Sequence, residues 1–178
     1  MRHIFRFLIC LGALTATGAL ADDVATCRKE SGDVAIEACN RVINSGRYSN
    51  QDVADSYMNR SAEWVFKSEY DRAIQDANAA LKLNPNFSQA YTNRGAAWAG
   101  KKEYDRAIAD HSKAIEIDTS NPASYVNRGE IKELRGDVKG AVSDYKAALA
   151  AKPKPGRYDN AAYFYDKARD RLKELAKQ

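Results

Sequence analysis

The stretch Tyr91-Thr92-Asn93-Arg94-Gly95 decides the fold, because it is the middle copy of a motif that occurs three times. The other copies are Tyr57-Met58-Asn59-Arg60-Ser61 and Tyr125-Val126-Asn127-Arg128-Gly129, and each step along the chain is 34 residues. Sixteen residues after each arginine stands an aspartate that follows Ala-Ile-x or Ala-Val-x, at Asp76, Asp110 and Asp144. A constant period of this length, with two such elements in each period, predicts a repeat architecture.

Each period is predicted to contain two helices joined by a short turn. In the first period Tyr57, Ser61 and Trp64 recur at helical spacing, and a second apolar stripe runs over residues 70–81. Polar residues at 67–69 separate the two stripes, and Pro85 ends the second because proline cannot continue a helical hydrogen-bond ladder. The second period has the same layout, which indicates a stack of helical hairpins.

This pattern resembles the tetratricopeptide repeat (TPR), a 34-residue helical hairpin with aromatic, glycine, alanine and proline residues at fixed places. Tyr91, Gly95, Trp98 and Ala107 take four of these places in the second period. Lys132 departs from the pattern, because the other two periods have tryptophan there. The Asn-Arg-Gly form of the motif is similar to bacterial members of the family, and the start of the chain suggests an exported one.

The resemblance implies an all-α fold, a right-handed superhelix of three helix-turn-helix repeats. We expect the repeats to span residues 51–155, as units of about 54–87, 88–121 and 122–155. Residues 22–50 are expected to form a diverged helical hairpin in front of them. Residues 156–178 are expected to form a helix that caps the last repeat, because the end of a repeat stack needs a polar outer face.

The first 21 residues have the pattern of a secretory signal peptide. A basic start with Arg2 and Arg6 precedes a short apolar run, and Ala19-Leu20-Ala21 before Asp22 has the form of a cleavage site. The sequence therefore predicts cleavage after Ala21 and a periplasmic or secreted location, without membrane insertion of the cleaved chain. A retained membrane anchor is the alternative interpretation.

Charge and cysteine content narrow the class of function. The net charge is +4, and loss of Arg2 and Arg6 with the leader lowers it by two, which gives no basis for nucleic-acid binding. Cys27 and Cys39 remain, and an even pair in an oxidising compartment is expected to form a disulfide bond. The alternative is two buried thiols, and two cysteines are too few for a structural zinc site.

The family resemblance implies that the first helices of the repeats line a concave groove that holds extended peptides. The recurring groove residue is asparagine, whose carboxamide both donates and accepts hydrogen bonds, so three in register could follow a ligand backbone. The alternative is that each asparagine bonds a neighbouring helix. The predicted groove residues are Asn59, Asn93, Asn127, Gln89, Thr92, Glu130 and Glu133.

Three further features of the groove region bear on what it could bind. Glu130 and Glu133 would make one end acidic and suited to a basic ligand segment, or they are a solvated helix face. No predicted groove residue is Lys or Arg, so a clamp for a C-terminal carboxylate is not expected. His111 stands alone on an apolar stripe, where a packing role is expected rather than a ligand contact.

The motif arginines stand where the family has leucine, which needs an explanation. We predict that each pairs with the aspartate sixteen residues later, across the hairpin, and fixes the register of its two helices. The rival interpretation places the arginines on the groove wall as ligand contacts. The predicted structural pairs are Arg60 with Asp76, Arg94 with Asp110, and Arg128 with Asp144.

No catalytic set, metal-ligand cluster or phosphate-binding loop is recognisable in the sequence, so neither a cofactor nor a metal is expected. The sequence therefore favours a non-enzymatic scaffold that binds an extended peptide segment of an exported partner protein in its groove. The alternative is a self-assembling or envelope-structural module that uses its convex face or the ends of the stack. An enzyme is disfavoured, although the fold alone does not exclude one.

Overall fold

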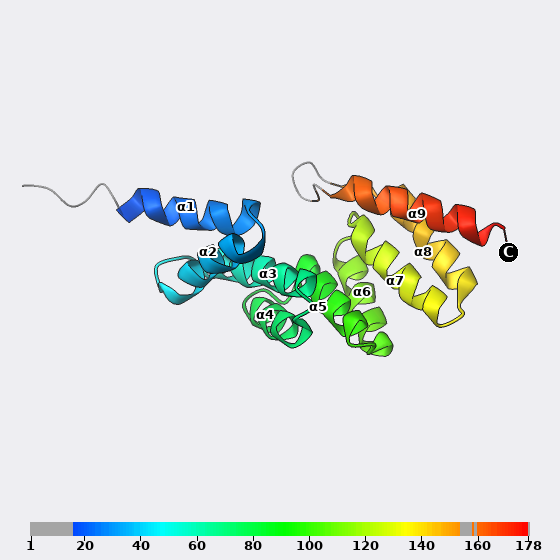
Figure 1. Cartoon of the computed structure of the whole chain (residues 1–178), viewed down its shortest axis with the longest axis horizontal. Coiled ribbons are helices and arrows are strands. Elements are labelled where there is room, and N and C mark those ends of the chain that lie inside the picture. The colour runs from blue at the N-terminus through cyan, green and yellow to red at the C-terminus, as the bar shows by residue number, and fades with distance from the viewer. Residues whose placement is uncertain (1–15, 154–157, 159, 178) are drawn as a thin grey trace, which may run out of the picture.

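The computed structural model describes residues 16–153, 158 and 160–177, and every regular element in these ranges is an α-helix. The helices form a superhelical stack of antiparallel hairpins, in which each hairpin packs on the next (Figure 1). They are α1 (Ala16–Lys29), α2 (Gly32–Asn44), α3 (Asn50–Phe66), α4 (Tyr70–Leu83), α5 (Ser88–Gly100), α6 (Tyr104–Ile117), α7 (Pro122–Leu134), α8 (Val138–Ala150) and α9 (Ala161–Leu175).

Local chemistry places the helix ends. Ser49 and Asp52 form a capping box at the start of α3, in which the Asp52 backbone N–H donates to Ser49 Oγ over 3.1 Å. The turn between the helices of each repeat contains one residue with positive φ, at Ser68 (59°), Lys102 (64°) and Gly136 (81°). This left-handed residue reverses the chain at the same place in all three repeats.

Within each hairpin the two helices approach closely where the family pattern has its small residue. A Cβ atom on Gly95 would lie 2.8 Å from the His111 ring, and one on Gly129 would lie 2.9 Å from the Tyr145 ring. Ser61 takes this place in the first repeat, and its hydroxyl donates to the backbone carbonyl of Ala73 over 2.9 Å. Small residues are therefore required on the first helix at this contact.

The N-terminal hairpin, α1 and α2, stacks on α3 as a further repeat would. Its Asp33 pairs with Lys67 across 3.0 Å, as Asp71 pairs with Lys101 one repeat later. Cys27 and Cys39 form the expected disulfide bond, with their Cα atoms 4.9 Å apart. The two cysteines face each other across the hairpin and are 12 residues apart in sequence, whereas the facing residues Gly95 and His111 of the second repeat are 16 apart. The N-terminal hairpin is therefore shorter by about four residues, or one helical turn.

Helix α9 covers the far end of the stack by packing on α7 and α8. Its Ala168, Phe164 and Leu172 contact the cluster around the buried Tyr145, and the Tyr165 hydroxyl donates to the backbone carbonyl of Ala151 over 2.8 Å. This is the position that the first helix of a fourth repeat would occupy. The predicted boundary at residues 155–156 lies outside the described residues.

Most of the predicted leader, residues 1–15, also lies outside the described residues. Helix α1 begins at Ala16, so the predicted cleavage position after Ala21 falls inside a helix of the uncleaved chain. Among the described helices, none combines the length and apolar character that a membrane span requires.

Candidate functional site

The motif arginines form two-pronged ion pairs with the aspartates of their own hairpins, in the arrangement that the sequence predicts. Arg60 Nη2 lies 2.7 Å from Asp76 Oδ1, and the other two pairs have the same separation. The arginine side chains are only 16–22% exposed. The guanidinium groups therefore join the two helices of a hairpin, and the rival placement as ligand contacts on the groove wall is not supported.

Each of these arginines also bonds to the preceding hairpin. Arg94 Nη1 donates to Asn78 Oδ1 over 2.6 Å and Arg128 Nη1 donates to Ser112 Oγ over 2.9 Å. Arg60 makes the equivalent bond to Asn40 of α2. One side chain thus fixes both the register of its hairpin and the stacking of successive hairpins, which leaves asparagine as the polar motif residue that can face the groove.

A first pocket of about 340 Å³ lies along α3, α5 and α7. Four of the predicted groove residues line it and so come together on one surface, namely Asn59, Gln89, Thr92 and Asn93. Arg28 from α1 and Asn160 from the segment before α9 also line it. Helix α1 and the segment before α9 therefore extend the groove beyond the three repeats.

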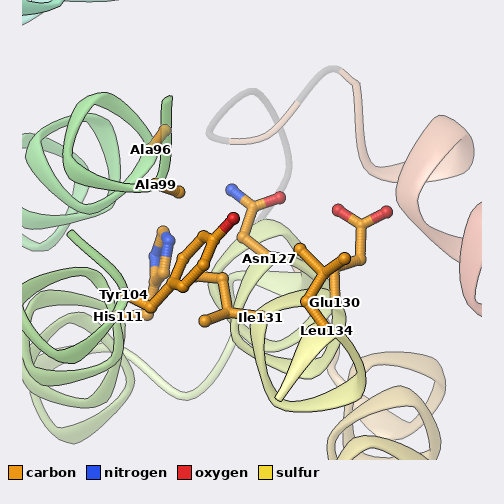
Figure 2. A pocket seen from close by; sticks show the side chains of 8 residues that line it. All are labelled: Ala96, Ala99, Tyr104, His111, Asn127, Glu130, Ile131 and Leu134. Carbon is orange, nitrogen blue, oxygen red and sulfur yellow. The ribbon is translucent and has the colours of Figure 1, made fainter. Parts of the chain in front are cut away.

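A second pocket, of about 230 Å³, lies further along α5 and α7, where α6 contributes to it (Figure 2). Asn127 and Glu130 line this pocket together with His111. The two pockets share no lining residue, but both lie on the side of the stack formed by the first helices. The sequence prediction of a groove along these helices agrees with this placement.

The three motif asparagines differ in their hydrogen bonding. Asn93 Nδ2 donates to the backbone carbonyl of Met58 on α3 over 3.0 Å, which is the alternative that the sequence left open. Among the described residues, none forms a hydrogen bond with the carboxamide of Asn59 or Asn127. The predicted ladder of three equal asparagines therefore becomes two open carboxamides and a third, Asn93, that has used one of its two N–H donors.

The structure corrects the expectation for Thr92. Its side chain is 7% exposed, and its hydroxyl lies 3.0 Å from the backbone carbonyl of Ser88 and 2.7 Å from the hydroxyl of Ser124. Asn121 Nδ2 also donates to it over 3.3 Å. The hydroxyl thus ties α5 to α7 and is not open to a ligand, although Thr92 is one of the residues that line the first pocket.

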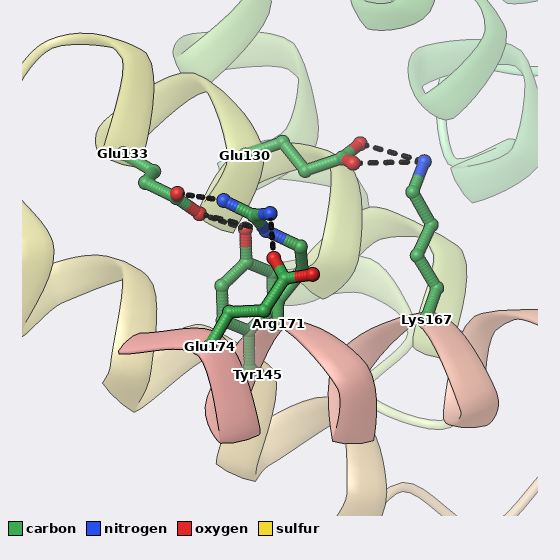
Figure 3. Close-up of polar contacts among 6 residues, drawn as sticks. All are labelled: Glu130, Glu133, Tyr145, Lys167, Arg171 and Glu174. Atoms are coloured by element: carbon green, nitrogen blue, oxygen red, sulfur yellow. Dashed lines mark hydrogen bonds and ion pairs between the residues drawn. The ribbon is translucent and has the colours of Figure 1, made fainter. Parts of the chain in front are cut away.

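The expectation of an acidic groove end is also corrected. Figure 3 shows that Glu130 and Glu133 face two cations of α9. Glu130 pairs with Lys167 across 2.8 Å, while Glu133 pairs with Arg171 and accepts a hydrogen bond from the Tyr145 hydroxyl over 2.9 Å. The bond to Glu133 raises the pKa of Arg171. Both carboxylates are therefore paired within the fold and do not form an unpaired acidic site, although both line a pocket with Arg171 and the Glu130 side chain is 32% exposed.

Sequence reasoning missed these flanking cations because it took groove residues only from the three repeats. Arg28 on α1 lies 3.9 Å from Asp55 on α3, and burial raises the pKa of Asp55. Lys167 and Arg171 stand four residues apart on α9, a spacing that places both on one face of a helix. Glu130 and Glu133 have a similar spacing on α7, so the sequence could have indicated that these two acids face the two cations of α9.

His111 is fully buried, and neither of its ring nitrogens has a hydrogen-bond partner among the described residues. Burial lowers its pKa to about 3, and the nearby charge of Arg128 acts in the same direction. The imidazole is therefore neutral at physiological pH. Within the described ranges, no group of His, Cys, Asp or Glu side chains is arranged to hold a metal ion.

Compared with protein-family models the sequence matches none, and no curated protein matches it. Solved TPR structures are similar in fold. The first TPR of Spaghetti (RPAP3), bound to the HSP90 peptide SRMEEVD, has a TM-score of 0.59 and 20% identity over 71% of this chain and 93% of its own. A MamA protein structure has a TM-score of 0.60 and 21% identity, over 90% and 94%.

The Arabidopsis OM64 TPR domain is similar to a comparable degree, with a TM-score of 0.55 and 24% identity over 69% of this chain and 99% of that domain. At such identities the likeness establishes the architecture and nothing finer. The chain has the all-α TPR-like fold that its 34-residue period predicts.

Proposed function

We propose that this chain is a non-enzymatic scaffold that binds an extended peptide segment of an exported partner protein in the groove along α3, α5 and α7. The observation that carries the proposal is the pair of open carboxamides, Asn59 and Asn127, in two successive pockets of that groove. A carboxamide can bond the backbone of an extended chain whatever its side chains are.

Similar folds support this use of the groove. The RPAP3 structure holds an HSP90 peptide, and another structural neighbour is described as a TPR2B-domain complex of yeast Sti1 with Hsp70. In this chain the charged groups around the groove are already paired, as Arg28 with Asp55, Lys167 with Glu130, and Arg171 with Glu133. An uncharged segment therefore suits this groove better than an acidic peptide would.

The exported location of the partner is part of the proposal. It rests on the leader-like residues 1–21 and is supported by the Cys27–Cys39 disulfide bond, since such bonds persist in oxidising compartments. A periplasmic scaffold would meet segments of other exported proteins before they are folded or assembled.

Photocrosslinking in the cells that make this chain tests the proposal. A photoreactive amino acid replaces Gln89, which lines the first pocket, or Lys146, which is exposed on α8 and serves as the matched control. We expect a discrete partner to crosslink at Gln89 only, in the exported fraction. The crosslink should weaken in an Asn59→Ala, Asn127→Ala double variant, and a synthetic peptide of the crosslinked segment should compete with it.

Equal crosslinking from both positions would contradict a groove-specific scaffold. A crosslink between two copies of the chain, with a mass that rises with concentration in size-exclusion chromatography, would favour the self-assembling module instead. A partner found only in the cytoplasm would refute the exported location while leaving the groove in place.

A further inference from the structure

The N-terminal hairpin supplies part of the wall of the first groove pocket. Arg28 on α1 lines this pocket together with Asn59 and Gln89 of the repeats. Among the described residues that line the pocket, Arg28 has the only charged side chain. The contacts that hold α1 against the repeats therefore decide whether this guanidinium is present in the groove.

In every repeat, the residue that follows the small residue of the motif lines the groove. Ala62 follows Ser61 and lines the first pocket. Ala96 and Glu130 stand at the same position of the later repeats and line the second pocket. This position therefore faces the groove wherever the two helices of a hairpin keep the register of the repeats.

The cysteines of the N-terminal hairpin keep this register. Cys39 takes the place of His111, because the next residues, Asn40 and Ser112, each accept a hydrogen bond from a motif arginine of the following repeat. Cys27 is bonded to Cys39 and so takes the place of the small residue on the first helix. The residue after Cys27 consequently stands at the groove position of this hairpin.

That residue is Arg28, and the disulfide bond is what fixes it there. The repeats fix their register with the arginine–aspartate pair. In the N-terminal hairpin, Thr26 directly before Cys27 and Ala38 directly before Cys39 stand at the two positions of that pair. Neither side chain carries a charge, so they cannot form an ion pair. The disulfide bond has the role here that the ion pair has in the repeats.

Other contacts hold α1 weakly once the leader is removed. Cleavage after Ala21 leaves only residues 22–29 of this helix, which is too short to be stable as an isolated helix. Of these residues only Cys27 is buried. Asp23 pairs with Arg41 of α2 over 2.7 Å, but the arginine side chain is 54% exposed, and surface pairs of this kind contribute little.

The guanidinium of Arg28 has hydrogen-bond donors available for a ligand. Its Nη2 atom lies 3.9 Å from Asp55 Oδ2, which is beyond hydrogen-bonding range, and the Arg28 side chain is 60% exposed. Asp55 therefore balances the charge of the guanidinium without using its N–H groups. A guanidinium has five donors and no acceptor, so it complements the carbonyl oxygens of an extended peptide backbone.

We propose that the Cys27–Cys39 disulfide bond completes the groove, by holding Arg28 where its guanidinium donates to a backbone carbonyl of the partner segment. This role of Arg28 rests on the proposed scaffold function and export, and it adds a ligand contact from outside the three repeats. The cysteines are positioning residues, because they act through Arg28.

The groove is therefore complete only in the oxidised chain. Bond formation removes two protons and two electrons from the thiols of Cys27 and Cys39, and a disulfide-bearing oxidant accepts them as it becomes a dithiol. The reduced chain keeps its three repeats, but α1 is no longer fixed to α2 and Arg28 leaves the first pocket.

Crosslinking from residue 89 in a set of matched variants tests this role. The photoreactive amino acid replaces Gln89 in all of them, so each variant reports on the same pocket. We expect Arg28→Ala to lower the yield of the partner crosslink at least fivefold. Lys29→Ala, at the neighbouring exposed position of α1, is the control and should leave the yield unchanged. Cys27→Ser with Cys39→Ser should lower the yield as much as Arg28→Ala does.

Combining these changes separates positioning from stability. Arg28→Ala added to the cysteine double variant should cause no further loss, because an unattached Arg28 no longer reaches the groove. Hydrogen exchange of the double variant should show lost protection in α1 and α2 and unchanged protection in α5 to α8. If the double variant does not fold, Arg28→Ala still tests the contact, since it keeps the disulfide bond.

Three outcomes would contradict the proposed role. A further loss in the triple variant would show that Arg28 acts without the disulfide bond. A loss in the cysteine variant but not in Arg28→Ala would show that the bond only stabilises the fold. If neither change affects a crosslink that the parent chain forms, the scaffold function stands and the role of Arg28 is refuted. Absence of the crosslink in the parent chain would instead refute the groove function itself.

Discussion

Arg94 and Asp110 form a two-pronged ion pair between α5 and α6, with Nη2–Oδ1 and Nε–Oδ2 distances of 2.7 and 2.8 Å. Hydrogen bonding to Asp110 raises the pKa of Arg94, so the arginine stays charged. The same geometry recurs at Arg60 with Asp76 and Arg128 with Asp144. Because each arginine also bonds to the preceding hairpin, the pair controls the stacking of the repeats as well as their internal register.

Replacing one partner of this ion pair should lower the free energy of unfolding more than replacing both partners. Arg94→Leu leaves Asp110 buried without its cation, and we expect a loss of about 3–5 kcal/mol in the free energy of unfolding. Arg94→Leu with Asp110→Leu should recover most of that loss. Urea unfolding of the two single variants and the double variant gives the coupling energy, and additive effects would refute the structural role.

Arg106→Leu is the control, because Arg106 is 61% exposed and lies 4.0 Å from Glu103. It should change the free energy of unfolding by no more than about 1 kcal/mol.

The buried His111 should make the fold sensitive to acid. Its pKa is about 3 in the folded chain and 6.5 in the unfolded chain, so only the unfolded chain binds a proton between these values. Stability from this group is therefore complete above pH 6.5 and is lost as the pH falls towards 3. The loss is about 1.4 kcal/mol per pH unit, or about 3 kcal/mol at pH 4.

Thermal unfolding from pH 7 to pH 4 measures this effect, with His111→Leu as the comparison. The variant should be at least as stable at pH 7, because it removes two unpartnered polar atoms, and its Tm should fall less steeply. Carboxylate protonation acts on both proteins equally. Parallel curves for the two would show that His111 is hydrogen-bonded or accessible to water.

The motif asparagines should separate into two kinds. Asn93→Ala removes the bond to the Met58 carbonyl and should lower the free energy of unfolding by about 0.5–1.5 kcal/mol. Asn59→Ala and Asn127→Ala remove no such bond and should leave Tm unchanged while they weaken capture of the partner segment. Equal effects of all three on stability would contradict this division.

The disulfide bond should stabilise the N-terminal end of the stack. Cys27→Ser with Cys39→Ser removes a crosslink that closes a 12-residue span, and the expected loss is about 3 kcal/mol on the chain-entropy account. Dithiothreitol should destabilise the unaltered chain by a similar amount and leave the double variant unaffected. Hydrogen exchange should place the loss of protection in α1 and α2, since they form one hairpin.

Helix α9 should determine the charge that the groove presents. Lys167→Gln with Arg171→Gln removes the cations from Glu130 and Glu133 and should produce salt-sensitive binding of a tetralysine peptide. The unaltered chain should not bind that peptide, and Arg169→Gln, on the exposed side of α9, is the control. Binding of tetralysine to the unaltered chain would show that the carboxylates remain open.

The 34-residue period by itself determined the helices, their turns and the partners of the motif arginines. Helical spacing is a local property of the sequence, and residues at the same position of successive repeats face equivalent positions of the neighbouring helix. Hence Arg94 could be matched to Asp110 without coordinates. The resemblance placed Asn59 and Asn127 in the groove for the same reason. The pairing of Cys27 with Cys39 was predicted on another ground, an even pair of cysteines behind an export leader.

The tertiary structure alone decided which of these groups stay open. Whether a carboxamide is free depends on a carbonyl of the neighbouring helix, as Met58 shows for Asn93. The partners of Glu130 and Glu133 come from α9, a helix outside the repeat, whose position no period predicts. A residue's position within the 34-residue period determines which residues of a repeat face each other. The space and the charges left between helices depend instead on packing across the whole stack.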